Sequence, residues 1–483
     1  MPDHYYRLRP IESLLGVHKE LETQTIYFAS PEELNDPMEG FKDLFWMGDE
    51  ILWTNLFKHY LRCVSVTFTL ILLLGKEPVT WTDIPVEEPS HANGPGADEL
   101  DEKIFAAFFA QPSVAEFVRG LAQSGHPIRR DELSSYIRLM HPFASLVAQK
   151  VFAENMGGPP LDAPPEVWTA VIDALGNLPL ALREMAKAEK DIGSSPESVD
   201  LRATIFAIGR NTARQMDLIN QYNRHEAPDA RDTPNKTFFY FQFPDGYVDQ
   251  LSRLTYSKWH AACFMSDIGN SSLWGSYGDG HKGVALKFKA RTGARHPTLG
   301  LHGVNGWSHQ GPLRGLIQHE FLPVTYGNSH VPIDFFASLG NMSMDKLNRY
   351  WYQDASGARS ARPEKIFADQ PAWRKQYWDN YTRIISTKLD DWKHEKEHRL
   401  IFSSSLVDPA NSKAERALKY NFEDLLGIVF GIKTSEEHKM AIMKIIETKC
   451  RAESRFDFLF YQSHFLRDTG AIIHSPLSLL QFK

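Results

Sequence analysis

A long stretch with helical periodicity, from about residue 99 to residue 225, interrupts a chain whose other parts carry strand patterns. Its apolar residues recur three and four positions apart, as Phe105, Phe108 and Phe109 do. This spacing gathers apolar side chains on one face of a helix. It predicts four helices, at residues 99–124, 130–155, 165–190 and 198–224.

The flanking parts combine strand and helix patterns. Runs rich in β-branched and aromatic residues predict strands at residues 26–30, 64–74, 237–243, 260–266, 283–289, 320–326, 397–403 and 425–431. Helices are expected near residues 332–353, 370–391 and 434–449. We therefore predict an α+β fold, with a mixed or antiparallel β core and flanking helices, interrupted by a large helical insertion.

Composition indicates where the domain borders lie. Residues 75–98 are rich in Pro, Gly, Glu and Asp, a composition typical of a linker. We predict that residues 1–75 form the N-terminal part of the α+β core, 76–235 the linker and helical insertion, and 236–483 the C-terminal part of the core.

Charge and cysteine content exclude several classes of protein. The net charge is −7 with mixed signs along the chain, which argues against a broad surface that tracks nucleic-acid phosphates. Three scattered cysteines, without a C-x-x-C pair, indicate a reducing compartment. The apolar run at 64–74 is shorter than the ~20 residues that span a bilayer. We expect a soluble, cytoplasmic protein that does not enter a membrane.

Two segments match the sequence patterns of known functional motifs but lack the secondary structure that those motifs require. His394 to His398 spells H-E-x-x-H, a zinc motif that works on a helix, because residues i and i+4 then face one metal. The run continues into the strand-like Arg399 to Phe402, and on a strand the two histidines would lie ~13 Å apart. We predict no metal site there.

The segment Gly278 to Gly283 spells G-x-G-x-x-G, the pattern of a dinucleotide-binding loop. That loop needs a strand before it and a helix after it, whereas the strand-like Val284 to Phe288 follows here. We interpret the segment as a glycine-rich hairpin.

Three other segments place polar and aromatic residues in a recurring order. They are Asn35-Asp36-Pro37-Met38-Glu39; Trp274-x-x-Tyr277-x-x-x-His281-x-Gly283; and Trp392-x-x-Glu395-x-Glu397-x-Arg399, with Lys388 before the third and the strand 425–431 after it. Together, in this order, they resemble the bacterial family of domain of unknown function 2971. The resemblance covers about residues 1–70 and 255–450. In that family the positions of His394 and His398 are commonly aromatic.

The resemblance has implications and one departure. Families of enzymes that act on NAD or related nucleotides, the leading interpretation of this chain, often serve as bacterial toxins or anti-phage effectors, which implies the same class of activity here. The helical stretch of 99–225 is longer than expected of the family. It would act as a lid, a specificity module or a surface that docks a partner protein.

The third segment suggests a reaction at a sugar. On a strand, Glu395, Glu397 and Arg399 share one face, with successive residues ~6.6 Å apart. Paired carboxylates suit a site where positive charge develops on a sugar ring. We predict that Glu395, Glu397 and His281 are catalytic. Substrate-binding residues are predicted to be Arg399, Trp274, Tyr277, Asn35, Asp36, Glu39, Lys388 and Trp392.

The E-x-E strand is also similar, more weakly, to the ADP-ribosyltransferase arrangement, in which a Glu stabilises the ribose as nicotinamide leaves NAD. That similarity implies NAD or a related nucleotide as substrate, a protein or nucleic-acid acceptor, and no tightly bound cofactor. The first-strand Arg or His of those enzymes would be His4 or Arg7.

Two other functions stay open. The acidic residues could gather around a divalent cation in a hydrolase or nuclease, through Asp36, Glu39, Glu395 and Glu397. The chain could also be a non-catalytic sensor whose helical insertion binds a partner. Structural roles compete as well, because Trp274 and Tyr277 suit a core and the Asn35-Asp36-Pro37 segment suits a turn.

Overall fold

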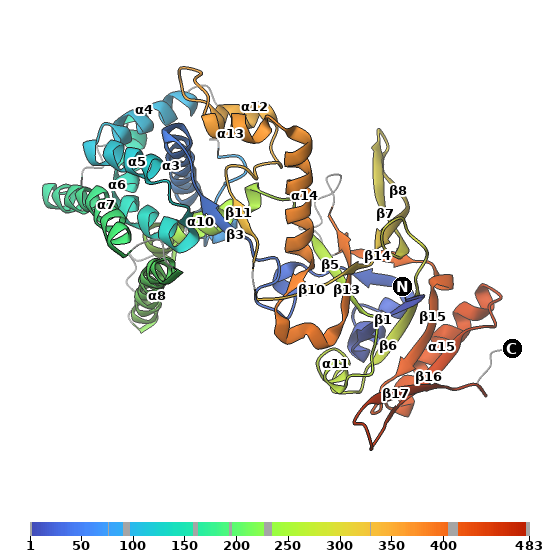
Figure 1. The fold of residues 1–483 in the computed structure, drawn as a ribbon. Coiled ribbons are helices and arrows are strands. Elements are labelled where there is room, and N and C mark those ends of the chain that lie inside the picture. The colour runs from blue at the N-terminus through green and yellow to red at the C-terminus, as the bar shows by residue number, and fades with distance from the viewer. Residues whose placement is uncertain are drawn as a thin grey trace. The chain divides into compact units, whose positions relative to one another are not determined.

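The computed structural model divides the chain into two compact units, each with its own core. It describes residues 2–75, 77–89, 97–157, 163–192, 196–226, 234–328, 330–403 and 414–479. Unit 1 comprises residues 1–41, 257–330 and 381–483, and unit 2 comprises residues 42–256 and 331–380. The structure confirms the predicted α+β class, with a mixed sheet and helices in the same chain (Figure 1).

Unit 1 is built around an eight-stranded sheet. Neighbouring strands are antiparallel except β15 and β16, which run parallel, so the predicted mixed core is confirmed. From edge to edge the strands are β17 (Ile472–Pro476), β16 (Leu459–Phe465), β15 (Leu425–Phe430), β6 (Val284–Lys289), β1 (His4–Arg9), β5 (His260–Met265), β13 (Glu397–Phe402) and β9 (Leu322–Pro323).

Smaller elements complete unit 1. A second sheet has the order β2 (Thr25–Tyr27), β14 (Ala417–Tyr420), β7 (Thr298–Ser308) and β8 (Gly311–Glu320), and a parallel pair joins β10 (Thr325–Tyr326) to β12 (Thr387–Lys388). The helices are α1 (Ile11–Leu15), α2 (Glu20–Thr23), α11 (Ser271–Ser276) and α15 (Glu436–Ala452). The helix α14 (Gln370–Ser386) begins in unit 2 and ends in unit 1.

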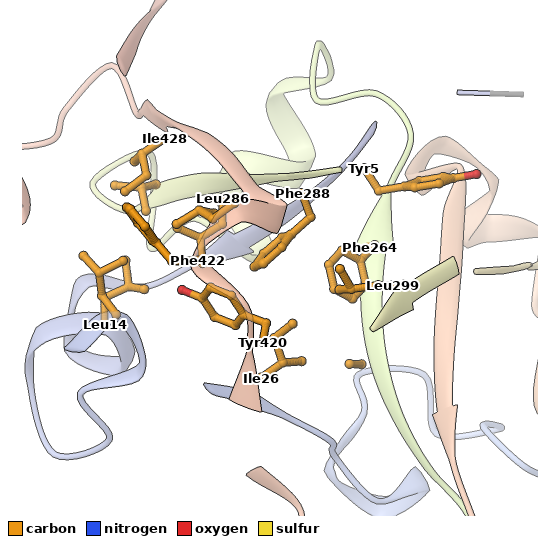
Figure 2. Close-up of a cluster of buried hydrophobic side chains, with 14 of the residues drawn as sticks. Tyr5, Leu14, Ile26, Phe264, Leu286, Phe288, Leu299, Tyr420, Phe422 and Ile428 are labelled. Atoms are coloured by element: carbon orange, nitrogen blue, oxygen red, sulfur yellow. The ribbon is translucent and has the colours of Figure 1, made fainter. Parts of the chain in front are cut away.

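The main core of unit 1 lies on one face of the large sheet. Alternate residues of each strand point to the same face, so Tyr5, Phe264 and Phe288 enter this core together. Leu14 of α1 and Tyr420 of β14 belong to the same cluster (Figure 2). The opposite face carries a smaller apolar cluster with Tyr6, Leu8, Met265, Trp274 and Val429.

The strands β1 and β5 separate along their length. β1 pairs with β6 over its whole length, but with β5 only at Tyr6 and Met265. Beyond that pair the two strands diverge, and a cavity opens where they part, lined by Arg7 and Leu8 of β1 and Ala261 and Cys263 of β5. The sheet thus forms a cavity wall without any loop insertion.

Unit 2 is mainly helical. Its helices are α3 (Glu50–Leu74), α4 (Ala97–Phe109), α5 (Pro112–Ser124), α6 (Arg130–Asn155), α7 (Pro165–Ile192), α8 (Pro196–Glu226), α9 (Pro234–Thr237), α10 (Phe243–Gln250), α12 (Met344–Leu347) and α13 (Ala361–Phe367). A small sheet joins β11 (Pro332–Asp334), β3 (Asp43–Trp46) and β4 (Ile128–Arg129). The prediction for 130–155 is confirmed, whereas the predicted helix 99–124 is broken before Pro112, which begins α5.

The strand predicted at 64–74 is wrong, because these residues form the last part of α3. Asp49 caps the helix by accepting a hydrogen bond from Leu52 N at 3.2 Å. Val64 and Thr67 are β-branched, yet both are fully buried against the rest of unit 2. Burial on a helix face therefore outweighs their preference for strands.

α3 is also the one described helix long and apolar enough to cross a membrane. Half of its most apolar window is buried inside the protein.

Three other local predictions are wrong. Residues 237–243 form a π-helix (Phe238–Gln242) that leads into α10, and Phe238, Phe239 and Phe243 are buried in the helical core instead of on a sheet. Residues 332–353 contain β11, the short α12 and a π-helix (Asn348–Tyr352) rather than one helix. The glycine-rich hairpin is absent, because β1 lies between β5 and β6.

The units also divide the chain differently from the predicted domains. Residues 42–75 and 236–256 belong to the helical unit, not to the core, and residues 331–380 return to it. The physical reason is the same as for the wrong strands. Aromatic and β-branched runs in these segments form helices that pack against the insertion.

Candidate active site

The guanidinium of Arg399 is the centre of a buried polar network on β13. Strand alternation places Arg399 on the same face as Glu397, and they lie opposite Cys263 and Met265 of β5. Arg399 Nε donates to Glu397 Oε1 at 2.8 Å, and its terminal nitrogens donate to Glu39 Oε2 at 2.8 Å and Oε1 at 2.6 Å. Further hydrogen bonds reach the Ile385 carbonyl at 3.0 Å and Glu397 Oε2 at 3.3 Å. All five N–H donors of a guanidinium are thus used.

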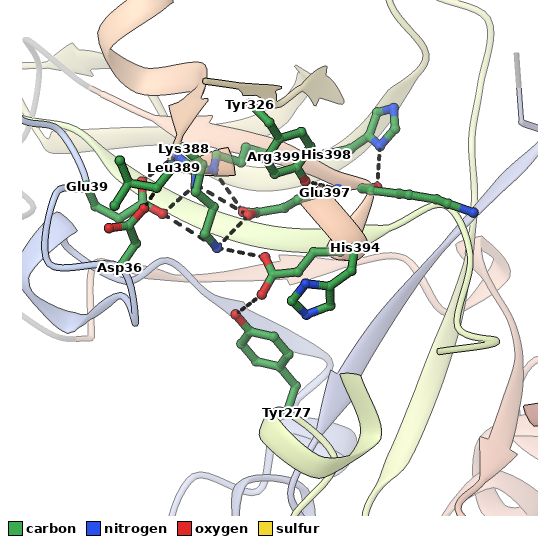
Figure 3. Close-up of polar contacts among 12 residues, drawn as sticks. Asp36, Glu39, Tyr277, Tyr326, Lys388, Leu389, His394, Glu397, His398 and Arg399 are labelled. Carbon is green, nitrogen blue, oxygen red and sulfur yellow. Dashed lines mark hydrogen bonds and ion pairs between the residues drawn. The ribbon is translucent and has the colours of Figure 1, made fainter. Parts of the chain in front are cut away.

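The ammonium of Lys388, at the end of β12, joins three carboxylates (Figure 3). Its Nζ lies 2.7 Å from Glu395 Oε2, 3.1 Å from Glu397 Oε2 and 3.7 Å from Glu39 Oε1. The same Nζ lies 4.7 Å from the ring centroid of Trp392, within cation–π range. Three carboxylates therefore share two cations, and the network carries one excess negative charge when all are ionised.

Glu395 reaches the network from a 3-10 helix rather than from the strand. That helix spans Asp390–Glu395, and Lys396 at φ 47° turns the chain into β13. The expectation that Glu395 lies on the strand face is therefore wrong, although its carboxylate still meets Lys388 beside Glu397. The Tyr277 hydroxyl donates to Glu395 Oε1 at 2.6 Å.

The Asn35-Asp36-Pro37-Met38-Glu39 loop is tied to Lys388 through Asp36. Asp36 Oδ1 accepts from Met38 N at 2.9 Å, which shapes the turn, and Oδ2 accepts from Leu389 N at 3.2 Å. The buried Asp36 thus fixes the loop to the residue after Lys388, while Glu39 binds Arg399. The first and third sequence motifs form one structure.

Burial and the neighbouring cations have opposite effects on the pKa values of the three glutamates in the network. Burial opposes ionisation of Glu397, but Arg399 and Lys388 outweigh it and lower its pKa to about 2. Burial raises the pKa of Glu39 and of Glu395, despite their cationic neighbours. A proton taken up by the network therefore goes to Glu39 or Glu395 before Glu397.

A cavity of about 210 Å³ lies beside this network, where β1 and β5 diverge. Its polar lining comes from Arg7, Arg9, Tyr27, Glu33, Asn35, Glu39, Cys263, Tyr277 and Lys388. Glu395 and Glu397 are not among the lining residues. The groups of the network that face a bound molecule are therefore Glu39, Lys388 and Tyr277.

Arg7 gives the cavity wall a buried positive charge. Its Nη2 donates to the Tyr27 carbonyl at 2.8 Å, but Nε and Nη1 have no acceptor, and no carboxylate is paired with it among the described residues. Burial, with Arg9 nearby, lowers the pKa of Arg7 to about 10, so it stays charged at neutral pH. The Phe264 ring, 5.6 Å from the Arg7 guanidinium, and the Glu20 carboxylate compensate this charge only in part, and a buried cation with two unpaired nitrogens favours an anionic group in the adjacent cavity.

The structure brings most of the predicted site residues together. Lys388, Glu39, Asp36, Glu395, Glu397, Arg399, Tyr277 and Trp392 belong to the network, and the exposed Asn35 lines the cavity. Trp274 is instead a core residue, fully buried, with its Nε1 donating to the Ile268 carbonyl at 2.8 Å. His281 lies in the turn after α11, with Nε2 at 3.5 Å from Ser271 Oγ, and does not line the cavity.

Gly283, the last residue of the second motif, has a packing role. A Cβ atom at this position would lie 2.4 Å from the Arg9 carbonyl oxygen, a severe clash. Only glycine lets the turn after Tyr277 press against β1.

Sequence reasoning did not name Cys263, Arg9 or Tyr326 as site residues, although Ala262-Cys263-Phe264 precedes the second motif in the resemblance to the family. Cys263 lines the cavity, and Tyr326 accepts a hydrogen bond from Glu397 N at 2.8 Å. For Arg9 the sequence did offer a signal. Arg7 and Arg9 place two charges at alternate positions of a strand that otherwise contains mainly aromatic and apolar residues. Nothing in the sequence around Tyr326 distinguishes it from a core residue.

The two pattern matches have ordinary structural explanations. His394 lies on the 3-10 helix and His398 on β13, so helical i, i+4 geometry does not apply to them. The glycines of 278–283 follow the helix α11 and precede β6, the reverse of a dinucleotide-binding loop. The position among Glu39, Glu395 and Glu397 that a divalent cation would need is occupied by the Lys388 ammonium.

Comparisons of this chain with protein-family models, with curated proteins and with solved structures gave no match.

Proposed function

We propose that unit 1 is an enzyme that binds NAD or a related nucleotide in the cavity and acts on its N-glycosidic bond. The reaction is the transfer of ADP-ribose to a protein or nucleic-acid acceptor, or hydrolysis. The ordered motifs also support membership of the family of domain of unknown function 2971, and with it a cytoplasmic toxin or anti-phage role.

The main support for the proposal is that two walls of the same cavity have opposite charges. The wall formed by Arg7 and Arg9 is cationic, although Arg9 is paired with Glu20. The network behind Glu39 and Tyr277 carries one excess negative charge when its three carboxylates are all ionised. NAD combines an anionic pyrophosphate with a cationic nicotinamide ribose, so its two ends match these two walls.

The cavity volume limits how much of the nucleotide is enclosed. About 210 Å³ is less than the ~300–1,000 Å³ of pockets that enclose a drug-sized ligand. The cavity therefore suits the reacting end of a dinucleotide, with the remainder bound outside it.

The network assigns different roles to the predicted catalytic glutamates. As the glycosidic bond breaks, positive charge develops on the ribose and is stabilised by the negative network through Glu39 and the Tyr277 oxygen. Glu395 holds the Tyr277 hydroxyl, and Glu397 holds Arg399 and Lys388. In this proposal Glu395 and Glu397 are positioning residues, because they do not line the cavity.

The test is nicotinamide release from NAD by the full-length protein, with and without cell lysate or nucleic acid as acceptor. Tyr277→Phe removes only the hydroxyl that bonds Glu395, and we expect it to lower turnover at least about 100-fold with little change in KM. Glu395→Gln should have a similar effect. Glu437→Gln, an exposed substitution on α15, is the matched control and should change nothing.

Each outcome has a defined meaning. Dependence of release on the acceptor separates transfer from hydrolysis. An absence of nicotinamide release under all conditions would overturn the proposal. Release that survives both Tyr277→Phe and Glu395→Gln would place the chemistry away from this network.

A further inference from the structure

The long helix α8 uses one face to attach to unit 2. Arg202 Nη1 donates to Glu132 Oε1 of α6 at 2.7 Å, and Arg210 Nη1 donates to Asp131 Oδ1 at 2.6 Å. The ring of Phe206 packs edge-to-face against Tyr136, with centroids 5.7 Å apart. These contacts fix which side of α8 faces α6.

A second face of α8 is apolar and exposed. Six residues on it, spaced mainly three or four positions apart, are each between 49% and 65% exposed: Leu201, Ile205, Ile208, Met216, Ile219 and Tyr222. At 3.6 residues per turn this spacing forms one stripe along the helix, the pattern of a helix–helix seam. An exposed apolar stripe of this length, interrupted between Ile208 and Met216 by uncharged polar residues, marks an interaction surface.

The stripe contains no charged residue. The other residues that helical geometry places on it between Leu201 and Asn223 are all uncharged: Thr204, Asn211, Thr212, Gln215 and Asn223. Arg202 and Arg210 face α6, and Asp217 accepts from Gln242 at 2.9 Å. A partner therefore needs no complementary charge, and two identical stripes can meet without like-charge repulsion.

The order of residues along the stripe is nearly the same in both directions from Thr212. Ile205 lies seven residues before it and Ile219 seven after, while Ile208 and Met216 lie four before and four after. Leu201 and Tyr222 lie eleven before and ten after. A two-fold axis through Thr212 would therefore bring apolar residues together at each level of an antiparallel helix pair.

We propose that the occupant of this face is a second copy of the chain, with the two α8 helices packed antiparallel about Thr212. Ile205 then contacts the partner's Ile219, and the two Thr212 hydroxyls meet at the axis. The paired stretch from Leu201 to Tyr222 is roughly 30 Å long at 1.5 Å per residue. The proposal does not depend on the reaction in unit 1.

Cysteine cross-linking tests the geometry in the full-length protein. Thr212→Cys should form a disulfide-linked dimer on mild oxidation, because the axis places each copy beside the other. Ile205→Cys alone should not cross-link, but a mixture of Ile205→Cys with Ile219→Cys protein should. Cross-linking of Ile205→Cys to itself would indicate a parallel pair and overturn the proposal. The wild type controls for the three native cysteines.

Sedimentation velocity tests the association itself. The wild type, a chain of 55.1 kDa, should shift toward twice that mass as concentration rises. The double variant Ile205→Asp/Ile219→Asp should stay monomeric with an unchanged melting temperature, whereas Leu180→Asp on α7, equally exposed, should dimerise like the wild type. A wild type that stays monomeric at every concentration would overturn the proposal, and would leave the face to another protein or a lipid surface.

Discussion

Arg399 shows how much a single side chain can hold together in unit 1. Its guanidinium joins the Glu39 loop, the Ile385 carbonyl at the end of α14 and Glu397 of its own strand. A lysine has three donors and no planar fork, so it cannot make these five contacts. The residue is completely buried, which means that water cannot replace any contact that is lost.

We expect Arg399→Ala to lower the free energy of unfolding by about 3–5 kcal/mol, because it leaves two buried carboxylates without their main cation. Urea denaturation followed by circular dichroism measures this. Arg399→Lys should restore only part of the loss. Arg383→Ala, an exposed change on α14, should stay within about 0.5 kcal/mol of the wild type. A loss below about 1 kcal/mol for Arg399→Ala would contradict the network.

Glu397 should make unit 1 sensitive to acid. Its pKa is about 2 in the folded protein, below the ~4.3 of an unfolded glutamate. A lowered folded-state pKa contributes stability that is present above pH ~4.3 and is lost as the pH falls toward 2. Glu39 and Glu395 act in the opposite sense, since their pKa values are raised and their contribution is lost as the pH rises.

Urea denaturation at a series of pH values tests the Glu397 contribution. We expect Glu397→Gln to be less stable than the wild type at pH 7, with the difference shrinking as the pH falls below the ordinary glutamate pKa. Glu397→Gln also removes a negative charge that helps to raise the pKa of Glu39 and of Glu395, so part of the change with pH comes from these two groups. A difference that is constant with pH would show that Glu397 is not held ionised by Arg399 and Lys388.

Among the elements, the starts of α3 and α13 depend on one carboxylate. Asp49 Oδ1 accepts from Leu52 N in α3, while Oδ2 accepts from Ser360 Oγ at 2.6 Å and from Ala361 N at 3.1 Å. Two helices of unit 2 that are far apart in sequence therefore share a cap.

Asp49→Ala should lower the free energy of unfolding of unit 2 by about 2–3 kcal/mol, because both helices lose hydrogen bonds. The loss of an ordinary cap costs only ~1 kcal/mol. Chemical denaturation measures the change. Ser435→Ala, which removes the cap of α15 alone, provides the comparison in unit 1 and should cost about 1 kcal/mol. Equal losses for the two variants would show that the second helix does not depend on Asp49.

On the scale of the whole molecule, each unit has a core of its own. The main core of unit 1 lies between its two sheets, and that of unit 2 between its helices. We therefore expect two transitions in differential scanning calorimetry. Arg399→Ala should lower the midpoint of one, and Asp49→Ala that of the other. A single transition that both variants shift equally would show that the units unfold together.

The sequence predicted the elements whose pattern agrees with their surroundings. The helix α6 and the strands β5, β6, β13 and β15 occur close to where periodicity placed them. The α+β class followed from these elements, and the three motifs contain most of the residues that meet in the buried network. Local patterns are sufficient there because the spacing of the apolar residues within each element already defines its buried face.

Tertiary structure decided what local patterns leave ambiguous. Val64 and Thr67 suit a strand, and only the helices packed around α3 make them helical. Trp274 and Tyr277 belong to one motif, yet one lies in the core and the other beside the cavity. The reason is that burial depends on residues distant in sequence. Arg399 meets Glu39 across 360 positions, and the cavity exists only because β1 and β5 diverge.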